Sequence, residues 1–340
     1  MSSPAAEAPV FADLTPERVL DALDAVGRRG DGRILQLNSY ENRVFQVFLE
    51  DGDAVVAKFY RPARWSDEQI LEEHAFALEL EAAEIPVVAP CVLQAAQAGV
   101  ELSGEPPTLA RAPGLLQRYR YALAPRRAGR APELDDPDVL RWIGRFIGRL
   151  HAVGSSRRFA HRLTLTPDGF GRAARDWLLA HDTIAPDALP AWRAACDAAL
   201  DAVQRAFDAA GALRTLRLHG DCHPGNLLWS DSGPHFVDLD DACNGPAVQD
   251  LWMLLSGDPA ALEAQLAVLL DGYRAFMDFD PRERALIEPL RTLRMIHHSA
   301  WIARRWSDPA FPIAFPFFAG AAYWQQQAQE LREQVEAMAR

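Results

Sequence analysis

Apolar and polar positions in the first 125 residues alternate with the two-residue period of β-strands, interrupted by two helical stretches. This alternation predicts strands at 33–37, 44–49, 54–59, 91–94 and 115–123. Helices are predicted at 15–26, where Thr15 is the cap and Pro16 the first helical residue, and at 66–84, which opens with a capping box from Ser66. The order is therefore strands, one crossover helix and further strands.

Beyond residue 135 the apolar positions recur at the three- and four-residue spacing of helices. Helices are predicted from Asp136 onward and at 170–182, 189–210, 259–277, 281–306 and 320–338. A stretch rich in Pro and Arg, 124–132, separates the two patterns. We therefore expect an α+β fold of two lobes, with an antiparallel sheet in 1–123 and a mostly helical lobe in 124–340.

The densest cluster of chemically active residues lies at 217–226 and is followed by Asp238. The apolar segments on either side predict a short strand before the loop and a hairpin of strands 227–229 and 235–237 after it. This hairpin would hold Asn226 at the start of one strand and Asp238 at the end of the other, and so bring them to one point. Two hard oxygen ligands at one point suit magnesium. With Asp221, this spacing is typical of phosphoryl transfer from ATP: Asp221 accepts the proton of the acceptor hydroxyl, while Asn226 and Asp238 hold Mg²⁺. The alternative is a polar loop followed by an ordinary hairpin, with Asp238 capping a turn.

Lys58 lies in the apolar strand 54–59. In a kinase-like lobe a lysine at this place holds the α- and β-phosphates of ATP and pairs with a glutamate on the next helix. Glu73 is an acid on the otherwise apolar face of helix 66–84, and a buried acid needs a positive partner, so we expect Lys58 to be that partner. Glu72 is the alternative glutamate. The alternative for Lys58 is an edge-strand side chain that reaches water.

The segment 38–43, Asn-Ser-Tyr-Glu-Asn-Arg, stands where such folds carry a phosphate-binding loop, and it contains no glycine. A small polar turn can still present backbone N–H groups and a hydroxyl to phosphate oxygens. Ser39 is expected nearest to ATP, with a turn-forming serine as the alternative. Arg43 could also reach a phosphate.

Other polar residues near the loop are expected to support it. Asp240, two residues after Asp238, would either assist a second magnesium ion or be solvated. Asp250 is predicted to be a structural acid that bonds the backbone of the loop. His219 and His223 are expected to orient the loop.

The charge, the apolar runs and the cysteines of the chain disfavour several classes of protein. The formal net charge of −12 opposes nonspecific binding to nucleic acid. No run of eighteen apolar residues predicts a membrane span, and residues 1–7 lack the basic and apolar blocks of a signal peptide, so a cytoplasmic protein is expected. We also expect a monomer. The four cysteines form no CxxC pair, which disfavours a disulfide scaffold or zinc. Cys222, beside Asp221, is either a redox sensor or a small buried residue, and its acidic neighbours favour the second.

The chain resembles the bacterial stress response kinase A family, serine/threonine protein kinases whose fold is similar to that of aminoglycoside phosphotransferases and choline kinases. The stretches that carry the resemblance are 37–44, 55–62, 219–226, 237–252 and 306–312. The resemblance implies a phosphotransferase that binds ATP and Mg²⁺ between its lobes, a protein Ser/Thr as acceptor, and a role in the stress response.

The sequence departs from eukaryotic-type protein kinases at two places. The magnesium-binding strand reads Asp-Leu-Asp rather than Asp-Phe-Gly, and no Ala-Pro-Glu segment or long Ser/Thr-rich activation loop follows. Activation by loop phosphorylation is therefore not expected. Two other functions remain open at this point: a kinase of small hydroxyl compounds such as aminoglycosides, choline or a homoserine-like alcohol, and a nucleotide-binding regulator without catalysis.

Overall fold

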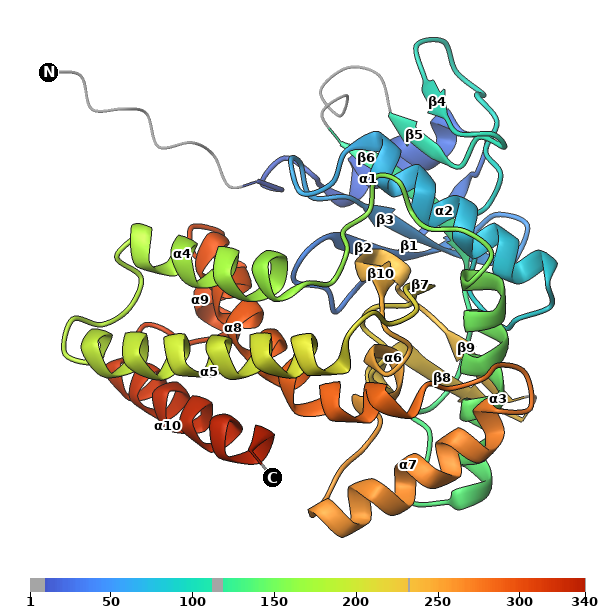
Figure 1. Ribbon diagram of the computed structural model, residues 1–340. Coiled ribbons are helices and arrows are strands. Elements are labelled where there is room, and N and C mark those ends of the chain that lie inside the picture. Colours follow the sequence, from blue (N-terminus) through green and yellow to red (C-terminus); the bar gives the residue numbers. More distant parts are fainter. Residues whose placement is uncertain (1–9, 112–118, 232, 340) are drawn as a thin grey trace, which may run out of the picture. The chain divides into compact units, whose positions relative to one another are not determined.

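The computed structural model describes residues 10–111, 119–231 and 233–339, which fold into two compact units (Figure 1). The first unit comprises Met1–Ala131 and Leu227–Asp240, and the second comprises Pro132–Asn226 and Asp241–Arg340. These units differ from the predicted lobes 1–123 and 124–340. The hairpin that follows Asn226 belongs to the first unit, because its Phe236 exchanges backbone hydrogen bonds with Pro86 (2.7 Å) and Val88 (3.0 Å).

The first unit is built on an antiparallel six-stranded sheet in the order β1-β2-β3-β6-β5-β4, with β8 and β9 pairing separately. Its elements are α1 (Pro16–Ala25), β1 (Gly30–Leu37), β2 (Arg43–Leu49), β3 (Ala54–Phe59), α2 (Asp67–Ala82), β4 (Glu101–Ser103), β5 (Leu109–Arg111), β6 (Arg120–Pro125), β8 (Leu227–Ser230) and β9 (Gly233–Phe236).

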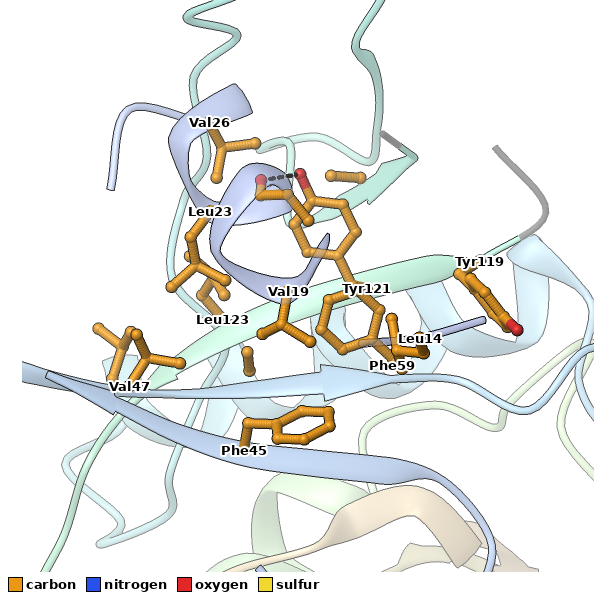
Figure 2. Packing of buried hydrophobic residues seen from close by; sticks show 14 of the residues in the cluster. Leu14, Val19, Leu23, Val26, Phe45, Val47, Phe59, Tyr119, Tyr121 and Leu123 are labelled. Atoms are coloured by element: carbon orange, nitrogen blue, oxygen red, sulfur yellow. Dashed lines mark hydrogen bonds between the residues drawn. The ribbon is translucent and has the colours of Figure 1, made fainter. Parts of the chain in front are cut away.

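The main core of this unit lies between α1 and one face of the sheet. Thr15 caps α1 by accepting the N–H of Arg18 at 3.5 Å, and the apolar face of the helix then covers β2, β3 and β6. At the centre the Tyr121 hydroxyl donates to the carbonyl of Ala22 at 2.7 Å, which satisfies a polar group inside the core. Figure 2 labels Leu14, Val19, Leu23, Val26, Phe45, Val47, Phe59, Tyr119, Tyr121 and Leu123 of this cluster.

The opposite face of the sheet is covered in part by α2. Ser66 and Gln69 form the predicted capping box, with hydrogen bonds of 3.3 and 2.9 Å. Ile70 of α2 packs with Ala122 of β6. Because Ala122 is directly opposite Lys58 in the ladder, and opposite residues share a face, Lys58 also lies on the α2 side of the sheet.

The second unit is mostly helical, as predicted. Its elements are α3 (Pro137–Gly154), α4 (Ala173–Ala180), α5 (Leu189–Ala210), β7 (Leu216–Leu218), β10 (Cys243–Gly245), α6 (Gln249–Trp252), α7 (Pro259–Tyr273), α8 (Ile287–Arg304), α9 (Ala310–Ala314) and α10 (Ala321–Met338). The end of α3 lies directly on β7, since a Cβ on Gly154 would collide with the carbonyl oxygen of Arg217. This close approach fixes the strand that enters the polar loop.

Several sequence predictions need correction. The segment 91–94 is not a strand, although the Cys91 N–H is bonded to the Leu123 carbonyl at 2.7 Å. The strands β4 and β5 were not predicted, nor were β10, α6 and α9. Of the predicted strand 115–123, residues 115–118 lie outside the described residues, and β6 continues to Pro125. Helix 170–182 starts as a π-helical turn at Pro167 and helix 281–306 as a 3₁₀ turn at Pro281.

No helix in the described ranges is long and apolar enough to cross a membrane.

Candidate active site

The backbone of the loop after β7 is hydrogen-bonded to the buried carboxylate of Asp250, as the sequence predicts. Asp250 is 1% exposed and accepts the backbone N–H groups of His219 and Gly220, each at 2.8 Å. Its Oδ2 also lies 3.0 Å from Nε2 of His151. Burial would raise the pKa of Asp250, but these hydrogen bonds and the neighbouring histidines outweigh it and lower that pKa. The loop backbone therefore has a charged, fixed anchor.

Gly220 is required by the path of this loop. Its φ is +86°, and a Cβ there would collide with the carbonyl oxygen of Asp241. Its own carbonyl accepts Nε2 of Gln249 at 2.8 Å. Two side chains of the short helix α6 therefore form hydrogen bonds to the loop backbone, those of Gln249 and Asp250.

Asp221, the predicted base, follows directly and is 19% exposed. Its Oδ1 accepts from Nη1 of Arg294 on α8 at 2.5 Å. Its Oδ2 lies 3.5 Å from Nε2 of His223. Because Nδ1 of His223 accepts the N–H of Gly225 at 3.0 Å, Nε2 carries the proton and faces the carboxylate. Both histidines of the loop therefore orient it, since His219 Nδ1 similarly accepts the Asp221 N–H at 3.4 Å.

Asn226 is oriented by the same loop. Its Nδ2 donates to the backbone carbonyl of Asp221 at 2.9 Å, which settles which end of the amide is the oxygen. Oδ1 is thus left as a possible ligand for a hard cation, directly before β8. Asn226 ends a 3₁₀ turn, and β8 begins at the next residue.

In the first unit, Lys58 meets two carboxylates. Its Nζ lies 2.9 Å from Oδ1 of Asp238 and 3.8 Å from Oδ1 of Asp240. Burial alone would lower the pKa of Lys58, but the two carboxylates, joined by Tyr60 and Glu73, raise that pKa well above its ordinary value. Lys58 is therefore a permanent cation beside the predicted metal ligand.

Asp238 does not lie in a strand, contrary to the prediction that it ends one. β9 ends at Phe236, and Asp238 has a φ of +60°, a left-handed conformation that is uncommon outside glycine. Such strain is typical of functional positions. Its side chain is 53% exposed, so a carboxylate oxygen remains open to a ligand. An exposed carboxylate and an amide oxygen are donors that fit a hard divalent cation.

Asp240 is buried rather than solvated, and it does not lie in a strand. It lies in a 3₁₀ turn, is 4% exposed, and contacts Nδ2 of Asn42 at 3.2 Å and Nη1 of Arg64 at 3.3 Å. Its role is therefore to tie the 38–43 segment to the Lys58 region.

Glu73, rather than Glu72, is the buried glutamate of α2, at 6% exposure. Its carboxylate belongs to the negative groups that raise the pKa of Lys58, and it lies 3.8 Å from Nε2 of His74. The shortest ion pair recorded for Lys58 is nevertheless with Asp238.

The 38–43 segment links β1 to β2 and is held by arginines that sequence reasoning missed. Asn42 Oδ1 accepts the backbone N–H of Arg61 at 3.0 Å, and Nε of Arg61 donates to the carbonyl of Glu41 at 2.9 Å. The Glu41 carboxylate in turn lies 2.9 Å from Arg64. Ser39 is half-buried in this segment. Arg61 belongs to the Lys-Phe-Tyr-Arg-Pro stretch at 58–62, which carries part of the family resemblance, whereas Arg64 lies two residues beyond that stretch.

Arg43 lies away from Lys58. It is directly opposite Phe59 in the ladder and thus on the α1 face, where its guanidinium stacks on the Phe11 ring at 4.6 Å. Lys58 is on the other face of the same sheet. Arg43 and Lys58 are therefore not directed at a common phosphate.

Cys222 is 1% exposed, and burial together with Asp250 and Asp221 raises the pKa of its thiol well above its ordinary value. Both observations favour a small residue packed under the loop over a redox sensor.

Among the described residues, no group of three or more His, Cys, Asp and Glu side chains is arranged to hold a metal ion.

The comparisons first define the class of protein. Residues 33–287 match the model of the phosphotransferase enzyme family. In structure, the chain is similar to an amicoumacin kinase solved with AMP-PNP and Ca²⁺, with a TM-score of 0.69, 19% identity, and coverage of 94% of this chain and 93% of that one. A microcompartment-associated aminopropanol kinase gives a TM-score of 0.68 at 16% identity, covering 95% and 98%. At these identities the likeness shows the fold alone.

Closer relatives narrow the family. Stress response kinase A of Salmonella choleraesuis (strain SC-B67) is 45% identical over 335 residues, covering 96% of this chain and 94% of the relative. Its counterpart in Escherichia coli (strain K12) is 44% identical over 333 residues, with the same coverage. A relative from Salmonella typhimurium, named serine/threonine protein kinase RdoA, is 45% identical over 335 residues, covering 96% and 94%. The chain belongs to the stress response kinase A family of phosphotransferases. The expected α+β kinase-like fold is confirmed, and membership implies ATP and a divalent metal ion.

Proposed function

We propose that the protein is an ATP- and Mg²⁺-dependent kinase that phosphorylates Ser or Thr of an acceptor protein during the stress response. The observation that carries the proposal is the ion pair of Lys58 with Asp238 at 2.9 Å, a phosphate-binding cation beside a metal-binding acid. The names of the relatives that are about 45% identical support the acceptor class and the cellular role.

Asp221 accepts the proton of the acceptor hydroxyl. Arg294 donates to Oδ1 of its carboxylate at 2.5 Å, whereas His223 stands 3.5 Å from Oδ2, too far for a strong hydrogen bond, so Oδ2 is the proposed oxygen that receives the proton. Asp250 keeps the loop in place by holding two of its N–H groups. The proposed base is therefore positioned before any substrate arrives.

Oδ1 of Asn226 and the carboxylate of Asp238 are the proposed Mg²⁺ ligands. When bound, Mg²⁺ compensates the charge of the phosphate oxygens. Lys58 supplies a further positive charge for the phosphates, Glu73 supports it, and the Ser39 hydroxyl donates to a phosphate oxygen. Arg43 is left out of this set because it lies on the other face of the sheet.

We further propose that the protein acts as a cytoplasmic monomer without membrane or nucleic-acid partners. All four cysteines are free thiols, which suits a reducing compartment. Every proposed role is filled by residues of one chain. The net charge of −12 disfavours a polyanionic partner.

The test is phosphate transfer from radiolabelled ATP by the purified full chain. Dephosphorylated casein and myelin basic protein serve as protein acceptors, and choline, aminopropanol and an aminoglycoside as small ones. We expect Mg²⁺-dependent labelling of protein that is abolished by EDTA and by Asp221→Asn. Asp168→Asn, a surface acid that is 82% exposed, is the matched control and should keep full activity.

Two outcomes would reject the proposal. Labelling of an amino alcohol or aminoglycoside without labelling of protein would identify a small-molecule kinase. ATP binding without transfer to either class of acceptor, at any Mg²⁺ concentration, would identify a regulatory nucleotide-binding protein.

A further inference from the structure

A row of aromatic rings leads away from the proposed base within the second unit. Arg294, which contacts Asp221, lies one helical turn before His298 on α8. The His298 ring stacks on Trp301 with centroids 5.4 Å apart and meets Phe315 edge-on at 6.2 Å. The row therefore begins at the reacting site rather than at a remote surface.

The outer end of the row is open to solvent. Phe315 contacts Phe317 with centroids 6.2 Å apart, and Phe317 is 53% exposed. Ile313, in the same segment, is 81% exposed. Single exposed apolar residues are normal, whereas two large apolar side chains exposed within five residues, one of them in contact with the ring of Phe315, offer apolar surface to a partner. We call Ile313 and Phe317 the apolar anchor.

The charge along α8 differs from that of the whole chain. The chain has a net charge of −12, whereas α8 contains three arginines and one acidic residue, Glu288. Arg294 is 43% exposed and gives one of its N–H groups to Asp221, so its other donors remain for a ligand. Arg304, near the end of the same helix, stacks on Trp177 at 5.3 Å and has no acidic partner among the described residues. An acidic partner fits this helix.

The length of the row sets the size of an acceptor that could contact both of its ends. One helical turn and two ring-to-ring steps of 6.2 Å lead from Arg294 to Phe317. The two residues are therefore at most about 20 Å apart, a span that up to roughly six residues of extended chain cover. A peptide at Asp221 is long enough to contact Arg294 and the apolar anchor together.

We propose that the acceptor is an extended segment of a protein that lies along this row. An acidic side chain next to the phosphorylated Ser or Thr binds Arg294, and an apolar side chain five or six residues away packs on Ile313 and Phe317. This inference rests on the proposed protein kinase function and adds the recognition sequence to it.

The experiment measures phosphorylation of a Ser-centred positional peptide library by the full chain. Wild type is expected to select Asp or Glu within two residues of the serine, and Leu, Ile or Phe five or six residues from it on one side. The double variant Ile313→Ser with Phe317→Ser should lose the apolar selection and keep the acidic one. Its kcat/KM for the best peptide should fall roughly tenfold or more. Its ATP hydrolysis without peptide should match wild type.

Two further variants test the two contacts separately. Phe276→Ser is the matched control, because Phe276 is 51% exposed and follows α7, outside the row, and it should leave peptide selection unchanged. Arg294→Glu should slow transfer and change the selection beside the serine from acidic to basic residues. That inversion is not expected from loss of positioning alone.

The failures of the two proposals are distinguishable. If wild type phosphorylates peptides without an apolar preference, or if Phe276→Ser has the same effect as the double variant, the docking surface is wrong and the kinase assignment stands. If no peptide is phosphorylated but choline or aminopropanol is, the protein kinase assignment itself is wrong.

Discussion

Glu283 should make the stability of the second unit depend on pH near neutrality. This glutamate is 2% exposed, and its Oε2 accepts the backbone N–H of Val248 at 2.8 Å. It lines a cavity of about 300 Å³ together with Arg214, Leu216, Ala247, Met277, Asp278, Phe279 and Asp280. Burial raises the pKa of its carboxyl from 4.5 to about 7, against the lowering effect of the Val248 hydrogen bond.

The direction of this pH dependence follows from the protonation of Glu283 in the folded and in the unfolded chain. Below pH 4.5 the carboxyl is protonated in both the folded and the unfolded chain. Between pH 4.5 and about 7 only the unfolded chain loses the proton, so the free energy of unfolding falls as pH rises. Above about pH 7 the folded chain loses the proton too, and the free energy of unfolding stops falling. Compared with a side chain that stays uncharged in both states, Glu283 therefore lowers the free energy of unfolding by about 1 kcal/mol at pH 5 and by about 3 kcal/mol at pH 8.

Glu283→Gln removes the charge and keeps an oxygen for the Val248 N–H. We expect the variant to gain stability over wild type as pH rises, by about 2 kcal/mol between pH 5 and pH 8. Urea unfolding followed by tryptophan fluorescence at pH 5, 6, 7 and 8 measures this difference. Glu336→Gln, an exposed glutamate of α10, is the control and should show no such trend. A difference between Glu283→Gln and wild type that does not change with pH would refute the reasoning.

Four further substitutions test the site. Asp221→Asn should reduce kcat by ~10²–10⁴-fold with ATP affinity nearly unchanged, and near-normal turnover of the folded variant would exclude Asp221 as the base. Asp238→Ala should abolish Mg²⁺-dependent ATP binding in calorimetric titration; unchanged affinity would make Asp238 a turn residue only. Asp250→Ala leaves the buried N–H of His219 and the partly buried N–H of Gly220 without their acceptor and should lower the free energy of unfolding by about 2–4 kcal/mol in urea unfolding, whereas a change under about 0.5 kcal/mol would contradict its role as anchor. Wild type and Cys222→Ser should respond equally to peroxide, and an activity loss confined to wild type would restore the sensor hypothesis.

Local signals in the sequence were sufficient where a short segment decides its own structure. The capping box of Ser66 predicted the start of α2, and apolar alternation predicted β3 to the residue. Asp250 was also predicted correctly, although it lies 31 residues after His219, because it stands in one of the stretches that carry the family resemblance. By contrast, 91–94 makes isolated backbone hydrogen bonds but no ladder, and the sequence does not reveal whether a neighbouring strand offers one.

The contacts that the sequence could not predict join residues far apart in the chain. Arg294 contacts Asp221 across 73 residues, and no spacing rule connects α8 to the loop. The left-handed backbone of Asp238 depends on how the chain leaves β9, which residue types alone do not reveal. Arg43 was expected near a phosphate because of its charge, but the register that pairs it with Phe59 turns it to the opposite face of the sheet.

The division of the first unit into two sequence segments has a consequence for synthesis on the ribosome. The hairpin 227–240 that completes this unit is separated from 10–131 by 132–226, which belong to the second unit. When residue 131 emerges, Pro86 and Val88 still lack their backbone partner in Phe236, and Lys58 lacks Asp238. The nascent chain therefore cannot assemble the Lys58–Asp238 pair until about two-thirds of the protein has been made. An expression fragment that stops near residue 131 would contain all six strands of the sheet but would lack the backbone partner of Pro86 and Val88 and the Asp238 partner of Lys58.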